Sequence, residues 1–394
     1  MKKIYLIIAG VIAILLLVAI WLYLLIYGTP KPVEQFFTDF TFSGTGENIP
    51  FEPSLPPLDP GSQVDVTTAK LRQLTIKPII GLGEHTEGED LSRISYIRYA
   101  ETGTGHIFSI NIITGEEKRI SNATIAGASK AVFSPNGKYV AIASGNTTQN
   151  TVTLITLTNN DTATTQLLSQ KMVDFNFSAT NELRYTEYSS SGLTGRSLNP
   201  DTLVGSTIFT IPFQSATVIW NTETNSPNYV YPKTSTKLPG YLYSLSNGSI
   251  KRLNVTGNAL TVEANKDYYV STQQVGEKPS SFITKVIDKK ISTLPLIMEP
   301  SKCVFSTKDF NILYCGYELT EYSYEFPDNW YKGLISFSDT IWQIDVEKGS
   351  ATQIVNPETE TGRAVDITNM SIGSTNEVLY FINKTDNTLW MYEI

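Results

Sequence analysis

Short stretches of alternating apolar and polar residues fill most of the chain after residue 70, and turn signals separate them. The clearest example runs from Ala131 to Ser144, A-V-F-S-P-N-G-K-Y-V-A-I-A-S. It reads as a strand, a Pro-Asn-Gly-Lys turn and a second strand, because period-two alternation predicts strands and Pro and Gly at these turn positions favour a tight reversal. The pattern therefore predicts an all-β region built from hairpins.

This hairpin recurs at a nearly constant spacing. An apolar residue marks the first strand of each copy, at Phe133, Phe177, Ile219, Val262, Phe305 and Ile372. Successive copies lie 44, 42, 43, 43 and 67 residues apart. A second hairpin completes the units, with turns such as Thr114-Gly115 and Lys348-Gly349 where a positive φ is needed. A period of about 40–45 residues is typical of the four-stranded blades of β-propellers.

The last unit lacks a fourth strand, because the chain ends at Ile394 after what reads as the third. Leu71 to Thr75 reads as an isolated fourth strand, and we expect it to pair with Leu389–Ile394. This pairing would close the ring and remove an open sheet edge. The fold class expected for residues 71–394 is an all-β, seven-bladed β-propeller of four-stranded antiparallel blades.

The motif F-S-P-N-G-K-Y-V-A-I-A, which starts at Phe133, resembles the F-S-P-D-G-K-x-I-A-F pattern of TolB-type and WD-like β-propeller repeats. Asn136 replaces the usual Asp, the WD dipeptide is absent, and the other units match by spacing and apolar pattern. The layout also resembles single-span, propeller-bearing membrane proteins of the bacterial envelope. The resemblance implies the fold but no reaction, since propellers host many functions.

The N-terminus has a different pattern. Residues 4–27 are 24 residues without a charge and follow Lys2 and Lys3, while about 20 apolar residues suffice to span a bilayer. The run is too long for the apolar part of a cleaved signal peptide. We expect residues 1–27 to be a cytoplasmic start and a transmembrane helix acting as a signal anchor, and the Pro-rich residues 28–70 to be an extracytoplasmic linker. The expected location is that of a single-pass membrane protein with its N-terminus in the cytoplasm and its propeller outside.

The amino-acid composition limits the partners that the chain can bind and the reactions that it can catalyse. Lys and Arg number 30 against 38 Asp and Glu, a net charge of −8, which is unfavourable for binding nucleic acid. There are two His and two Cys, and no Walker, G-x-S-x-G or H-E-x-x-H motif. A His-dependent mechanism would have to use His85 or His106. The acidic stretch from Glu84 to Asp90 fits a solvated turn better than a divalent-ion site. We expect no catalytic residues, no metal and no cofactor.

The 67-residue period contains about 24 extra residues between Tyr314 and Ile341. We expect this insertion, Gly316 to Asp339, to lie over one mouth of the ring. Its aromatic residues are the candidate partner-binding residues, with Trp330 and Tyr331 as the best anchors: Tyr322, Tyr324, Phe326, Trp330 and Tyr331. Two interpretations remain open, because a long insertion either caps its own blade or contacts a partner.

Cys303 and Cys315 are 12 residues apart in the first hairpin of the sixth blade. A hairpin centred on Asp309 would place them opposite each other, about 4.5–5.5 Å apart at Cα. An exported domain lies in an oxidising compartment, which favours a disulfide over two buried thiols.

Taken together, these features favour a binding or scaffold module in a cell-envelope assembly, with the membrane and another envelope protein as partners. Two alternatives remain. One is a hydrolase or lyase that acts on glycan or peptide at the propeller channel, and the other is a small-ligand sensor.

Overall fold

A computed structural model describes residues 69–88, 94–146, 149–158, 162–168, 172–221, 227–246, 248–319, 322 and 325–394. The propeller belongs to a compact unit, Gln63–Ile394. The predicted transmembrane segment and the linker up to residue 68 lie outside the described residues. No helix within the described ranges is long and apolar enough to cross a membrane.

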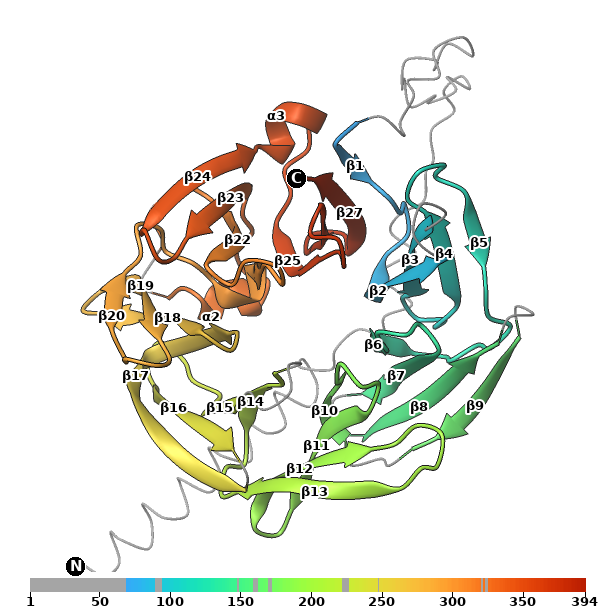
Figure 1. Cartoon of the computed structure of the whole chain (residues 1–394), viewed down its shortest axis with the longest axis horizontal. Helices are drawn as coiled ribbons and strands as arrows, with labels where there is room; N and C mark the ends of the chain where they lie inside the picture. Colours follow the sequence, from blue (N-terminus) through green and yellow to red (C-terminus); the bar gives the residue numbers. More distant parts are fainter. Residues whose placement is uncertain are drawn as a thin grey trace, which may run out of the picture. The chain divides into compact units, whose positions relative to one another are not determined.

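Seven antiparallel blades follow one another around a ring (Figure 1), which confirms the expected fold class. The first blade consists of β2 (Ile79–Glu87), β3 (Ile94–Glu101), β4 (Ile107–Asn111) and β5 (Glu117–Arg119). The second consists of β6 (Ala128–Phe133), β7 (Tyr139–Asn146), β8 (Gln149–Leu157) and β9 (Ala163–Leu167). The third consists of β10 (Met172–Phe177), β11 (Leu183–Ser189), β12 (Gly192–Leu198) and β13 (Gly205–Ile211). The fourth blade consists of β14 (Ala216–Ile219), β15 (Asn228–Pro232), β16 (Pro239–Ser246) and β17 (Ser249–Ala264). The fifth shares β17 and adds β18 (Tyr268–Val275), β19 (Lys278–Lys285) and β20 (Ile291–Thr293). The sixth consists of β21 (Cys303–Phe305), β22 (Ile312–Tyr317), β23 (Thr340–Asp345) and β24 (Ser350–Val355). The seventh is β25 (Ile367–Ile372), β26 (Val378–Asn383), β27 (Thr388–Glu393) and β1 (Leu71–Gln73). Three short helices complete the described elements, η3 (Pro300–Lys302), α2 (Asp328–Tyr331) and α3 (Pro357–Thr361).

The strand β17 belongs to two blades. Its first half pairs with β16 and its second half with β18, so the fourth and fifth blades form one seven-stranded sheet. The change of partner coincides with a register shift between Asn258 and Thr261 and with a positive φ of 53° at Ala259. A β-bulge bends a strand and increases its twist, which turns the outermost strand of one blade into the innermost strand of the next.

The ring is closed as the sequence predicted. β1 pairs antiparallel with β27, with Leu71 opposite Tyr392 and Gln73 opposite Trp390. Beyond the strand, the Leu74 N–H donates to the Leu389 carbonyl at 2.7 Å. Arg72 is buried and donates to the Glu393 carboxylate at 2.9 Å. The first and last described segments therefore complete one sheet, in which β1 covers the edge of β27.

Turns between the first and second strands join neighbouring blades. The Asn136 N–H in the Pro-Asn-Gly-Lys turn donates to Asn181 Oδ1 of the third blade at 2.9 Å. Arg184 donates to the Asn221 carbonyl of the fourth blade at 2.7 Å. Across the closure, the Ser374 N–H donates to Glu84 Oε2 at 2.6 Å. The Asn-rich turns of the repeat thus hold adjacent blades together.

Candidate binding site at the mouth of the central channel

The first strands of the seven blades surround a cavity of about 1430 Å³. Side chains alternate along these strands between the two faces of each blade, and consecutive residues of one strand line the cavity, so the edge of each first strand borders the channel. In β17, for example, Leu260 and Val262 belong to a buried apolar cluster while Thr261 and Glu263 fall on the other face of the strand. Several blades contribute polar residues to the wall of the cavity: Lys130, Asp174, Thr217, Glu263 and Ser371.

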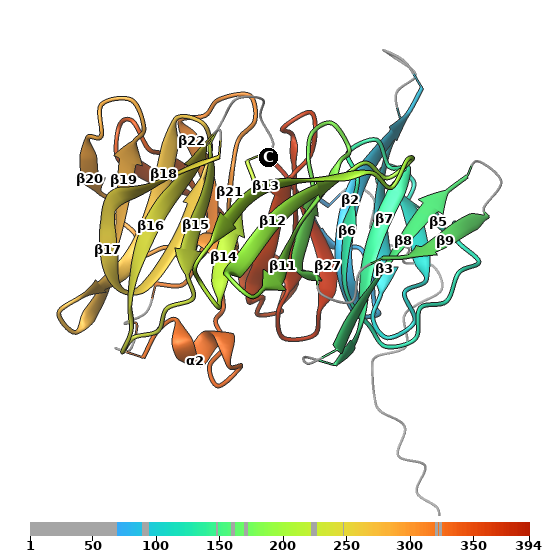
Figure 2. The same cartoon turned by 90° about the horizontal axis from the view of Figure 1, so that it is seen from below.

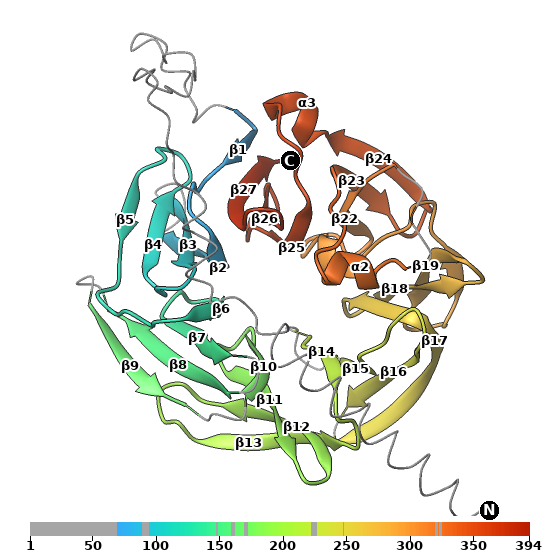
Figure 3. The same cartoon turned by 180° about the vertical axis from the view of Figure 1, so that it is seen from behind.

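The insertion between β22 and β23 lies over one mouth of this channel, as the strand order predicted. Figure 2 shows α2 on one side of the ring, and Figure 3 shows it near the inner ends of β18, β22 and β25. Asp328 accepts hydrogen bonds from the N–H and hydroxyl of Thr236 in the fourth blade, at 3.1 and 2.9 Å. Gln274 of the fifth blade donates to the Phe326 carbonyl at 2.8 Å. The insertion is therefore attached to blades other than its own.

The aromatic residues of the insertion mostly form a small core. Phe326 and Trp330 are each 1% exposed, and Phe337 and the partly buried Tyr322 pack beside them. The rings of Tyr322 and Phe326 lie 4.5 Å apart between centroids. This burial agrees with an insertion that packs as a cap, although its hydrogen bonds reach blades four and five and not its own blade alone. It removes Trp330 and Phe326 as exposed anchors. Tyr331 remains 53% exposed, and Tyr324 lies outside the described residues.

A buried charge cluster, which sequence reasoning did not find, holds this cap in place. Lys302 Nζ lies 2.5 Å from Asp339 Oδ2 and 2.7 Å from Asp366 Oδ1, and all three side chains are at most 2% exposed. The Trp330 Nε1–H donates to both oxygens of Asp366 at 2.9 Å. Burial raises the pKa of Asp339 to about 6, although the charge of Lys302 opposes this shift. The cluster joins the insertion to the first strands of blades six and seven.

Tyr331, the last residue of α2, is fixed by a buried carboxylate. Its hydroxyl donates to Glu299 Oε1 at 2.6 Å, and Ser301 Oγ lies 3.3 Å from the same oxygen. Glu299 is 2% exposed, and this burial raises the pKa of its carboxyl. The pKa of Tyr331 is raised well above its ordinary value by loss of solvent and by the charge of Glu299. The half-exposed ring of Tyr331 is thus held in one orientation at the channel mouth.

Two further ionisable groups lie in the channel wall next to this pair. Loss of solvent raises the pKa of Glu263 to about 7. The pKa of Tyr231 is raised by burial and by the negative charges of Glu299 and Glu263. Tyrosines with raised pKa values remain protonated at neutral pH and are poor nucleophiles, whereas Glu263 can gain or lose a proton there.

Both histidines lie outside the channel lining. His85 is 3.4 Å from Glu87 and sits against Gly137, where an added Cβ would come within 2.5 Å of Nδ1. His106 is 3.5 Å from Glu101 and 3.0 Å from Thr124. Within the part of the chain that is described, His, Cys, Asp and Glu side chains form no group of three or more placed to hold a metal ion. The histidines thus belong to contacts in the first blade and at its border with the second.

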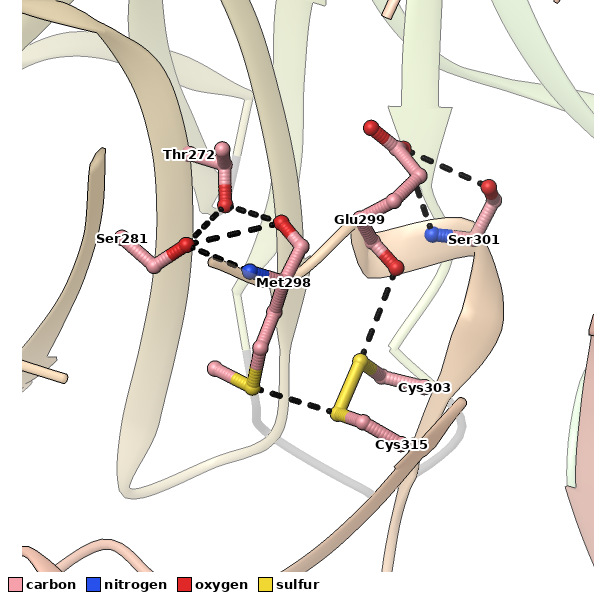
Figure 4. The surroundings of a disulfide bond; sticks show 7 residues. All are labelled: Thr272, Ser281, Met298, Glu299, Ser301, Cys303 and Cys315. Atoms are coloured by element: carbon pink, nitrogen blue, oxygen red, sulfur yellow. Dashed lines mark hydrogen bonds between the residues drawn. A yellow bond between two sulfur atoms is a disulfide. The ribbon is translucent and has the colours of Figure 1, made fainter. Parts of the chain in front are cut away.

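Cys303 and Cys315 face each other across β21 and β22, and the structure joins their sulfur atoms in a disulfide (Figure 4). Cys315 is fully buried and Cys303 is 6% exposed. Met298 lies beside them, and its backbone is held by Ser281 (Figure 4). Because Lys302 directly precedes Cys303, this crosslink lies next to the buried charge cluster.

No family model and no curated protein matches the chain. Among solved structures it is similar to an oligogalacturonate lyase in complex with manganese, with a TM-score of 0.52, 9% identity, and coverage of 81% of this chain and 98% of that one. It is also similar to the β-propeller domain of the Trilobed protease from Pyrococcus furiosus, with a TM-score of 0.50, 11% identity and coverage of 80% and 95%. TolB from Acinetobacter baumannii is a weaker neighbour, with a TM-score of 0.41, 9% identity and coverage of 68% and 78%. At these identities the similarity shows a shared β-propeller fold and nothing more specific.

Proposed function

We propose that the protein is a membrane-tethered, extracytoplasmic binding module of a cell-envelope assembly, and that its partner binds at the channel mouth beside α2. The observation that carries this proposal is the rim that the insertion builds over a cavity of about 1430 Å³. Tyr331 is held there by Glu299, so little side-chain freedom is lost when a partner binds. The 24 uncharged residues at positions 4–27 support the tether.

The place where the chain enters the propeller is compatible with this arrangement. β1 is the outermost strand of its blade and leads directly into β2, the innermost strand of the next. In a propeller, such links and the connections between second and third strands lie on the same face, and the insertion is one of those connections. The start of β1 therefore lies on the face opposite α2 (Figure 2). The position of the rim on the face opposite the start of β1 supports contact with a partner on that face.

Site-specific photo-crosslinking in membranes tests the binding surface. Tyr331 and, as a matched control, Tyr188 are each replaced by a photo-reactive phenylalanine, since their exposures are 53% and 50%. The proposal expects a discrete adduct from position 331 and none from position 188. Equal crosslinking at both positions, or none at position 331, would refute it.

Protease added to intact spheroplasts tests the location separately. The expected result is degradation of the propeller or of the Pro-rich linker. Complete protection until the membrane is lysed would reverse the proposed orientation.

A hydrolase or lyase acting on glycan or peptide is the second candidate function. The specific observation in its favour is Glu263, whose pKa of about 7 suits a general acid or base at neutral pH. Incubation with glycan and peptide pools should then release new reducing ends or amino groups, and Glu263→Gln should abolish the release.

A further inference from the structure

Glu263 is a carboxylate without an ion-pair partner among the described residues. It lies on the second half of β17, in the wall of the channel. No Lys, Arg or His among the described residues forms an ion pair with it. Glu263 is partly buried, and this loss of solvent raises the pKa of its carboxyl to about 7.

Two tyrosines and a second carboxylate surround the same part of the channel. Thr261, two residues before Glu263 on the same face of β17, donates its hydroxyl to Glu299 Oε2 at 3.4 Å, and the charges of Glu299 and Glu263 raise the pKa of Tyr231. Tyr331 extends from α2 to Glu299, and the charge of Tyr231 in turn contributes to raising the pKa of Tyr331. Glu299 already accepts hydrogen bonds from the hydroxyls of Tyr331 and Ser301, at 2.6 and 3.3 Å. Glu263 is therefore the member of this group that lacks a side-chain donor among the described residues.

Neighbouring positive charges do not neutralise Glu263. Across the channel, Lys130 is paired with Asp174 at 2.5 Å. Lys233, Lys237 and Lys332 are exposed at the rim, and none forms an ion pair with a described residue. The channel thus has an acidic, aromatic section on the strands and a basic section on the loops above it.

We propose that this channel section binds a positively charged ammonium or guanidinium group of a ligand, with Glu263 as its counter-ion and Tyr231 and Tyr331 lining the site. A cation is stabilised by a desolvated carboxylate and by the faces of nearby aromatic rings. This inference rests on the proposed binding function and adds the chemistry of the bound group. The group belongs either to a Lys or Arg side chain of a protein partner or to a free amine.

Calorimetric titration of the full chain in detergent tests the proposal with three probes. N-acetyl-arginine amide represents a side chain, putrescine a free amine and N-acetyl-glutamate amide an anion. The arginine amide or putrescine should bind, with an affinity that increases from pH 6 to pH 8 as Glu263 ionises. Glu263→Gln should weaken binding at pH 8 at least about tenfold and remove the pH dependence. Whichever cation binds more tightly identifies the source.

Glu347→Gln is the matched control, because Glu347 is exposed, lies on the turn between β23 and β24, 3.7 Å from Lys285, and does not line the cavity. It should bind the probes as the unaltered chain does. Equal binding to Glu263→Gln, or tighter binding of the glutamate probe at the basic rim, would overturn the proposal. A position-331 crosslink that persists without any cation binding would leave the proposed function standing and refute this inference alone.

Discussion

The buried charge cluster makes the sharpest prediction about stability. Lys302→Met keeps much of the side-chain volume but removes the cation shared by Asp339 and Asp366, at 2.5 and 2.7 Å. The two carboxylates would then remain buried together without a counter-charge. Asp339 Oδ1 already has no hydrogen-bond partner among the described residues. Trp330, which donates to Asp366, depends on the same arrangement.

Removing one partner of a buried ion pair costs about 3–5 kcal/mol. We expect the loss of unfolding free energy in Lys302→Met to lie toward the upper end of this range, because one lysine compensates two carboxylates. The loss should also depend on pH. A carboxyl whose folded-state pKa is raised stabilises the fold below its unfolded pKa, and this contribution is lost as pH rises through the folded value, here about 6 for Asp339. Without Lys302 that pKa rises further, so the loss should be larger at pH 8 than at pH 5.

Urea unfolding of the full chain in detergent, followed by tryptophan fluorescence, measures the effect at both pH values. Lys285→Met is the control, because Lys285 is partly exposed and 3.7 Å from Glu347. Exposed pairs contribute about 0–1 kcal/mol. If Lys302→Met loses no more stability than Lys285→Met, or if its loss does not change with pH, the cluster does not hold the cap as argued.

Three further predictions concern closure, crosslinking and capping. Deleting residues 389–394 removes the partner of β1 and should abolish the cooperative melting transition. Shortening the exposed turn at 287–289 should leave that transition in place. Equal effects of the two changes would contradict closure through β1 and β27. Non-reducing digestion and mass spectrometry should find Cys303 linked to Cys315, and replacing both by Ser should cost about 3 kcal/mol of unfolding free energy for a loop of this length; two freely alkylated thiols would rule out the bridge. Trp330→Ala should cost about 3–5 kcal/mol because the side chain is 1% exposed, while Tyr331→Phe should cost about 1–3 kcal/mol; similar values for both would contradict the distinct roles of the two residues.

The blade architecture followed from the sequence because it depends on local signals. Turn residues such as Pro135 and Gly137 and the alternation along each strand act over a few positions, and their repetition at 42–44 residues predicts the blades. The pairing of Leu71 with the C-terminus followed from counting strands. The continuous β17 was not predicted, because its change of partner occurs at a bulge with a positive φ at Ala259 that alternation does not reveal.

The candidate site needed the tertiary structure. The sequence located the insertion and its aromatic residues but left open whether Trp330 would be buried or exposed. That outcome depended on Lys302 and Asp366, which are 64 residues apart in the chain and meet at 2.7 Å. Glu263 and Glu299 carry no motif, and their raised pKa values arise from burial in a wall built by several blades. Local patterns determine strands and turns because those forces act between sequence neighbours, whereas burial and charge pairing are set by residues brought together when the ring closes.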